Sequence, residues 1–244
     1  MDLVPEPCKY IDFSSPDSTG IRALQYLTTL FIDALADAAK TLGESGDSAL
    51  LPIISSIVAS KAEQIGFYRL FSGQYPSERG FLTSIPPALA YSTFLQVIET
   101  CPFDLNAIGL TRSGVMFSDW LKVNESRTYC VDLAIEGVPS DFSDLSLSIV
   151  VGDQVPITVA PRNFSVNGTT LVFEADFPRH QQVLDGMIIA ELTKGPVSGG
   201  ADGLVKGSLA TAFIQFEQPL VGVSPIPTGD DLSCPQAAGD SRRR

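Results

Sequence analysis

The chain has 244 residues, of which 44% are hydrophobic and 18% charged, proportions that suit a folded protein with one large domain or two smaller ones. Its formal net charge of −12 disfavours nucleic acid as a partner, because binding to phosphates needs clustered Lys and Arg side chains. The one basic run is residues 242–244, at the end of a polar stretch, and no run of about 20 apolar residues predicts a membrane span.

The first predicted element is a helix over about residues 20–42. Ser18 or Asp17 can cap its first turn, and Gly43 suits the left-handed position that commonly follows a helix. Apolar residues recur at steps of three and four, which predicts one buried stripe made of Leu24, Leu27, Phe31, Ala34 and Ala38. The charged residues fall away from this stripe or along its edges, and they are Arg22, Asp33, Asp37 and Lys40.

A second helix is predicted over about 49–71, with Pro52 in its first turn and Gly73 after its end. Its expected inner face consists of Leu50, Ile54, Ile57, Val58, Ile65 and Tyr68. A Pro-rich connection leads to a shorter helix through Ala88, Leu95 and Ile98. These helices are too few and too unequal for a four-helix bundle from one chain, so either another chain supplies helices or an upstream portion is missing.

From about residue 127 the pattern changes to alternating or short apolar runs, separated by Asn, Asp, Gly and Pro. Six strands are predicted, over 128–135, 145–151, 154–159, 170–175, 187–192 and 209–217. Short strands with regular turns favour an immunoglobulin-like antiparallel β-sandwich. The fold class is therefore α+β and multidomain, with a helical domain over 1–110, the sandwich over 111–222 and a disordered tail over 223–244.

Catalytic signatures are scarce in this sequence. His180 is the only histidine, and it lies in a polar loop among predicted strands, where a surface position is expected. Metal chemistry inside a helical bundle needs paired Glu-x-x-His ligands, which this chain does not have. A Gly-x-Ser-x-Gly elbow, a phosphate-binding glycine loop, a Cys-x-x-Cys pair and a dinucleotide fingerprint are also absent from the sequence.

Several segments resemble the ferritin-like domain of fungal stress-response and late-sexual-development proteins, which are related to plant desiccation-related proteins. They are the body of the second helix and residues 8–13 (CKYIDF), 69–76 (RLFSGQYP) and 97–102 (VIETCP). The strand region, ending near 208–214, resembles the small sandwich that follows the bundle in that family. The resemblance implies a partial ferritin-like bundle over 1–110, because the family's N-terminal pair of helices is not in this chain.

The resemblance also locates a degenerate metal position. Family members usually carry Glu-x-x-His on the helix equivalent to the second, where this chain has residues 61–64 (KAEQ). The matching position on the first helix, usually acidic, is Thr29. By its spacing Lys61 faces inward, and its ammonium repels a cation, while Gln64 is a poor substitute for imidazole. The resemblance therefore implies no bound metal and no cofactor at Thr29, Lys61 and Gln64.

The four cysteines and three glycosylation sequons favour a secretory protein. By resemblance, Cys8 and Cys101 form a disulfide. The pairing of Cys130 and Cys234 stays open, and the alternative is that Cys130 is a small buried residue. The sequons begin at Asn124, Asn163 and Asn167. Against this, the first residues have neither a basic region nor an apolar signal core, which taken literally predicts a cytosolic product. The resemblance favours an extracellular location.

Two functions from different classes follow. The leading hypothesis is a non-catalytic, metal-free ferritin-like protein with a structural, stress-tolerance or developmental role. The alternative is a metal-independent enzyme or small-molecule binder in which Lys61 and Gln64 orient a small apolar ligand inside the helical unit. We favour a structural role for Lys61, either paired with a carboxylate such as Asp33 or extended to the bundle edge. If the chain is complete, its exposed apolar stripes predict a homodimer through the helical domain; if it is a fragment, they are an artefact.

Overall fold

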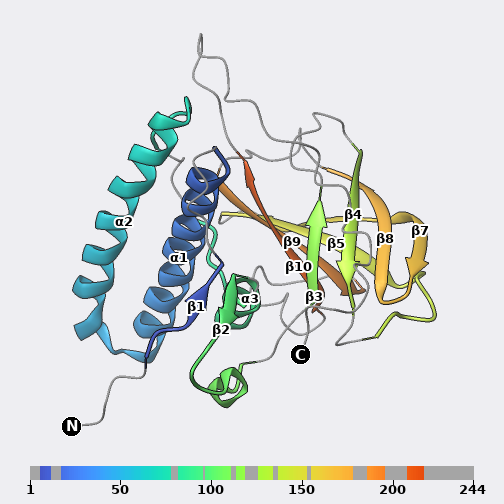
Figure 1. Cartoon of the computed structure of the whole chain (residues 1–244), viewed down its shortest axis with the longest axis horizontal. Helices are drawn as coiled ribbons and strands as arrows, with labels where there is room; N and C mark the ends of the chain where they lie inside the picture. The colour runs from blue at the N-terminus through green and yellow to red at the C-terminus, as the bar shows by residue number, and fades with distance from the viewer. Residues whose placement is uncertain are drawn as a thin grey trace.

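The computed structural model of the chain describes residues 6–11, 18–77, 82–95, 97–110, 114–118, 126–133, 137–152, 155–177, 186–195 and 208–216. It is a mixed α+β structure in which helices come first and mainly antiparallel strands follow, as predicted. Figure 1 shows α2 as the outermost helix, α1 beside it, and the large sheet on the far side of α1. The predicted disordered tail, 223–244, lies outside the described residues.

Two long antiparallel helices form a hairpin. They are α1 (Ser18–Ser45) and α2 (Leu51–Phe71), joined through a short 3₁₀ turn, η1 (Ser48–Leu50). The predicted end of α1 at Gly43 is wrong. The left-handed residue is Gly46, with φ 79°, and the amide of Asp47 donates to the Leu42 carbonyl at 3.0 Å, so this glycine closes the helix.

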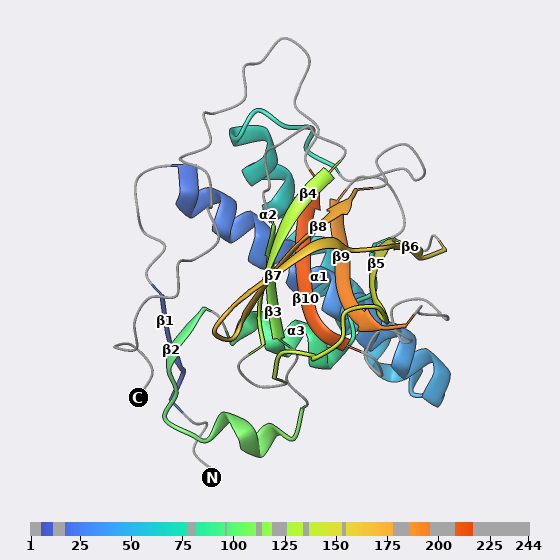
Figure 2. The same cartoon turned by 90° about the vertical axis from the view of Figure 1, so that its right-hand side faces the viewer.

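The third helix, α3 (Pro87–Phe94), is shorter than predicted. Ile98 was expected within it, but instead begins the strand β2 (Ile98–Thr100), which pairs antiparallel with β1 (Lys9–Tyr10). Figure 2 shows this small ribbon apart from the large sheet, with the 3₁₀ helix η2 (Leu105–Ile108) following β2. A propensity pattern cannot detect such a strand, because its partner lies about ninety residues earlier in the chain.

Eight strands form the large sheet, in the order β6-β5-β9-β10-β3-β4-β8-β7. Neighbours are antiparallel except β10 and β3, which are parallel. The strands are β3 (Gly114–Ser118), β4 (Ser126–Asp132), β5 (Leu145–Val151), β6 (Ile157–Val159), β7 (Arg162–Asn167), β8 (Thr170–Asp176), β9 (Gly186–Lys194) and β10 (Ser208–Phe216). The sequence missed β3 and β7. Most of β7 is polar and exposed, so no alternating pattern marks it.

One face of the curled sheet encloses the main core. Tyr129 of β4 stacks on Phe173 of β8, with ring centroids 5.2 Å apart. Both belong to one cluster with aliphatic side chains of β5, β9 and β10, such as Leu147, Ile188 and Ala210. Because strands from both ends of the sheet order meet in this cluster, the sheet must fold over so that its two halves face each other.

The opposite face of β5 and β9 is covered by helices. Leu30 of α1 and Leu89 of α3 form a second cluster with Val150, Met187 and Ile189. These two strands are therefore buried on both sides, which explains why their sequences are nearly continuous apolar runs. The helical part and the sheet, predicted as separate domains on either side of residue 110, share this cluster.

The predicted buried face of α1 is wrong. Leu24 and Phe31 of the expected stripe are 43% and 38% exposed, whereas Gln25, Thr29 and Asp33 are buried. On α2, only Ile65 of the expected inner face is buried, and Leu50 and Ile57 are exposed. The other expected residues of α2, Ile54, Val58 and Tyr68, are half-buried. Counting apolar residues therefore misplaced the buried face of α1 but identified most of the inner face of α2.

Candidate functional site

The predicted degenerate metal position draws on both long helices. Thr29 is buried on α1, and its hydroxyl donates to the Gln25 carbonyl one turn earlier at 3.0 Å.

Lys61 and Gln64 are brought together, one turn apart on α2. The Lys61 ammonium donates to Gln64 Oε1 at 3.1 Å. Lys61 is half-buried and Gln64 is exposed, so the amine lies at the surface of the hairpin. This position agrees with the structural role favoured for Lys61, in which its stem covers apolar surface and its ammonium reaches solvent. The ligand-binding alternative stays a prediction.

A buried polar stripe on α1 was missed by the sequence reasoning. It consists of Gln25, Thr29, Asp33 and Asp37, spaced four residues apart and facing the segment that follows α2. Gln25 Nε2 donates to Gln74 Oε1 at 2.8 Å, and Ser84 Oγ donates to Asp37 Oδ1 at 2.8 Å. The recurrence at four residues was the available signal, because it places all four side chains on one helix face.

Arg69 of α2 extends this polar layer. It is fully buried, and its Nε donates to the Tyr75 carbonyl at 2.9 Å. The backbone amide of Ile85 donates to the Asp33 carbonyl at 3.3 Å. These bonds hold residues 74, 75, 84 and 85 against the two long helices. The Asp37 carboxylate and the Arg69 guanidinium each hydrogen-bond to this neighbouring chain.

The sheet carries a second buried polar group, Glu191 of β9. It is fully buried and accepts a hydrogen bond from Thr211 Oγ1 of β10 at 2.5 Å. Ser148 of β5 lies directly opposite in register. Among the described residues, Ser148 Oγ and Glu191 Oε1 have no hydrogen-bond partner. Burial raises the pKa of Glu191 well above its ordinary value, and the Thr211 hydrogen bond lowers it only in part. Burial of this side chain therefore favours its protonated form.

The outer side of α2 is apolar and exposed. Phe67 and Phe71 are 65% and 62% exposed, and their ring centroids lie 6.3 Å apart. With Ile53, Ile57 and Leu70 they form what we call the α2 outer face. Figure 1 shows that this helix is the outermost layer of the molecule. Exposed apolar residues gathered along one helix favour an interaction surface over an active site.

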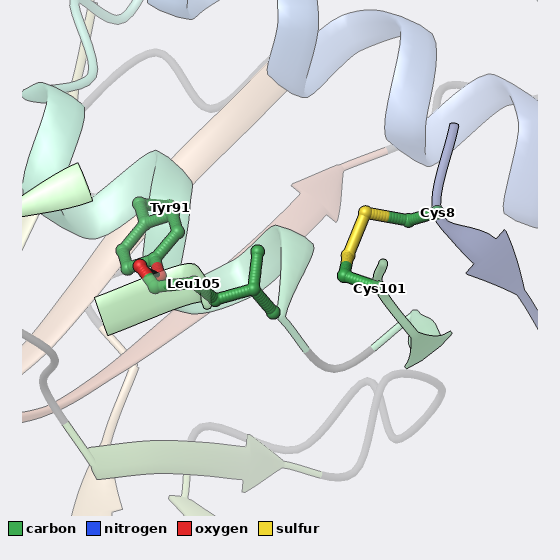
Figure 3. Close-up of a disulfide and its surroundings, with 4 residues drawn as sticks. All are labelled: Cys8, Tyr91, Cys101 and Leu105. Carbon is green, nitrogen blue, oxygen red and sulfur yellow. Dashed lines mark hydrogen bonds between the residues drawn. A yellow bond between two sulfur atoms is a disulfide. The ribbon is translucent and has the colours of Figure 1, made fainter. Parts of the chain in front are cut away.

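The disulfide expected from the resemblance is present. Cys8 and Cys101 are bonded, 93 residues apart in sequence, at the ribbon of β1 and β2. Figure 3 shows this bond and, beside it, Tyr91 of α3, whose hydroxyl donates to the Leu105 carbonyl at 2.6 Å. The bond and the ribbon together tie the segment before α1 to the segment after α3.

Cys130 on β4 is buried and is also disulfide-bonded, so the alternative of a simple buried thiol is wrong. Cys234 lies outside the described residues, as do Asn124 and His180. The other two sequon residues, Asn163 and Asn167, are exposed on β7. Within the described ranges, no three His, Cys, Asp or Glu side chains gather as metal ligands would.

None of the described helices is both long and apolar enough to cross a membrane. Comparison with known proteins adds no assignment, since no protein-family model and no curated protein matches the chain. The functional argument therefore depends on the geometry of the α1–α2 hairpin and of the sheet.

Proposed function

We propose that this chain is a non-catalytic structural protein that assembles as a homodimer through the α2 outer face. The observation that carries the proposal is the exposure of Ile53, Ile57, Phe67 and Phe71 on a helix whose opposite side already packs on α1. A helix that is apolar all round is typical of a protein interior. A second copy supplies that interior.

The spacing of the outer face fits an antiparallel pair of α2 helices. Ile53 and Phe71 lie equally far from Ala62 in opposite directions, and so do Ile57 and Phe67. A twofold axis level with residue 62, on the outer side of α2, therefore sets each isoleucine of one copy against a phenylalanine of the other. Such a self-complementary patch is what a symmetric dimer interface requires. Two hairpins joined in this way give four packed helices, the number in a ferritin-like bundle.

The charges of the chain also bear on this contact. Each copy has a formal net charge of −12, so two copies repel each other over most approaches. The five side chains of the outer face are uncharged, and Ser60 and Gln64 between them are uncharged as well. Glu63, one turn before Phe67, is exposed on the same side of α2, so the interface brings one carboxylate of each copy near the axis.

The proposal also includes an immunoglobulin-like fold for the sheet and membership of the fungal ferritin-like family. The sheet order is the one expected if β3 to β10 are strands A, B, C, C′, D, E, F and G of an immunoglobulin-like sandwich, with A and G parallel. The disulfide and the α1–α2 hairpin support kinship with the fungal ferritin-like proteins. Thr29, Lys61 and Gln64 support a metal-free member, whose role by resemblance lies in stress tolerance, development or the extracellular matrix.

Light scattering or sedimentation of the purified chain tests the dimer. We expect the wild-type mass to be that of two chains, and the F67E variant to be a folded monomer because it buries a carboxylate at the interface. The matched control is V155E, which adds the same charge at a residue 82% exposed and should stay dimeric. A wild-type monomer at micromolar concentration contradicts the proposal.

Elemental analysis of the same protein tests the metal-free assignment. Stoichiometric iron or manganese that survives dialysis contradicts it, whatever the oligomeric state. The two measurements therefore test separate claims: light scattering tests the dimer interface, and elemental analysis tests whether the helical part binds a metal.

A further inference from the structure

The strand β7 forms one end of the large sheet, and its second edge has no partner among the described strands. All of its residues except Phe164 are exposed. Two glycosylation sequons fall on it, Asn163-Phe164-Ser165 and Asn167-Gly168-Thr169. We propose that Asn163 and Asn167 each carry an N-linked glycan and that the two glycans close this open edge of the sheet.

Both acceptor side chains are held in accessible positions. The ring of Phe164 packs inward on Phe142 and Phe173, with centroid distances of 4.8 Å and 6.0 Å. This inward anchor leaves its neighbours Asn163 and Ser165 on the exposed side.

At the end of β7, Asn167 pairs with Thr170 across a two-residue turn that starts with Gly168 at φ 61°. A glycine at that turn position is typical of tight hairpins, and it leaves Asn167 and Thr169 exposed at the tip.

The chemistry is compatible with the folded environment. Transfer forms a bond from the asparagine Nδ2 to the anomeric carbon of an oligosaccharide and breaks that carbon's bond to a lipid-linked diphosphate donor. The diphosphate leaves with the bonding electrons, and the amide loses one proton. Asn163 Nδ2 donates to Glu174 Oε2 at 2.9 Å. Because a glycosylated amide keeps one N–H, this hydrogen bond can persist after modification.

The cysteines support the compartment that this modification requires. Cys8 and Cys101 are bonded, Cys130 is disulfide-bonded, and the described part of the chain holds no free thiol. Disulfides of this kind persist in the oxidising secretory pathway, where N-glycosylation also takes place. The sequons and the disulfides are independent observations that agree.

Closing the edge has a physical benefit. An exposed edge strand presents unpaired N–H and C=O groups to any other strand, and Val166 adds a half-exposed apolar side chain to it. Bulky glycans at both ends of β7 exclude a second strand. Figure 1 places β7 at the opposite end of the molecule from α2, so the glycans leave the α2 outer face uncovered.

The test is expression of the full chain in a eukaryotic secretory host behind a cleavable leader, followed by intact mass measurement. S165A removes the first sequon and T169A the second, while T169S keeps the second sequon and serves as the matched control. We expect S165A and T169A each to lose the mass of one glycan relative to wild type, and T169S to lose none. Unchanged masses for both alanine variants overturn the proposal.

Failure of a variant to fold or to be secreted does not prevent the test, because translation into isolated microsomes reports glycosylation of unfolded chains by gel mobility. Translocated chains that gain no glycan at either position overturn the proposal there too. Edge closure is tested on native F67E, which lacks the α2 contact. Enzymatic removal of the glycans should convert it from monomer to larger species. If it stays monomeric after deglycosylation, the edge-closing role is overturned.

Discussion

At the scale of single residues, Glu191 combines complete burial with one hydrogen bond, from Thr211. A carboxyl group in such a setting is stable only in its protonated form, since an ionised one would need a cation or several donors. Ser148, directly opposite on β5, offers a hydroxyl and no charge. Glu191 is therefore a polar core residue whose burial favours the protonated form.

This gives a pH dependence with a definite sign. The folded pKa of Glu191 is raised above its unfolded value near 4.5, so the folded state binds more protons. The contribution of Glu191 to the free energy of unfolding should be greatest when the pH is below the unfolded pKa. It should fall as the pH rises toward the raised folded pKa. Urea midpoints measured across pH at one protein concentration test this. E191Q should make the urea midpoint depend less on pH. Glu99→Gln, on exposed β2, should leave the pH dependence of the midpoint as in wild type.

At the scale of elements, both long helices end in the same way. At the end of α2, Gly73 has φ 74°, its amide donates to the Leu70 carbonyl, and the amide of Gln74 donates to the Arg69 carbonyl. This end fixes where the chain turns toward Gln74, whose side chain then reaches Gln25 of α1. One left-handed residue thus positions part of the buried polar layer.

Gly73→Ala and Gly43→Ala should act in opposite directions. The first forces a side chain into the left-handed region and should lower the free energy of unfolding by about 1 kcal/mol. The second lies within α1, where an added Cβ meets nothing within 4 Å, and should raise it by roughly 0.5–1 kcal/mol. Chemical denaturation measures both. Equal effects of the two substitutions would contradict the helix ends described above.

The same scale shows what the sequence can predict. The spans of α1 and α2 follow from apolar periodicity, and β5 and β9 from their apolar runs. The buried face of α1 does not, because Asp33 and Asp37 are buried by hydrogen-bonded chain that periodicity cannot anticipate. For the candidate site, the sequence predicted α2 as an apolar helix, but it did not predict that the α2 outer face is exposed. Glu191 was missed because a single acid in an apolar run carries no pattern.

At the scale of the whole molecule, the helices and the sheet are joined by the cluster around Leu30, Leu89 and Ile189. Such a shared core predicts cooperative unfolding, because neither part keeps its apolar surface covered without the other. The helical part and the sheet, on either side of residue 110, are therefore in contact through this cluster.

Ile189→Ala should weaken helices and sheet together. The substitution leaves a cavity in the shared cluster and should lower the free energy of unfolding by about 2–5 kcal/mol. Hydrogen exchange should become faster in both α1 and β4. Ile108→Ala makes the same truncation at a residue 48% exposed and should be close to neutral. Faster exchange confined to the sheet would show that the two parts unfold separately.

The place of β10 has a consequence for how the protein is made. Along the described chain it is the last strand, yet it lies between β9 and β3 and so connects the two halves of the sheet. A nascent polypeptide stalled before Ser208 would have β3 and β9 each lacking a neighbour. The sheet therefore cannot close until β10 has emerged from the ribosome, and until then chaperones have two unfinished edges to protect.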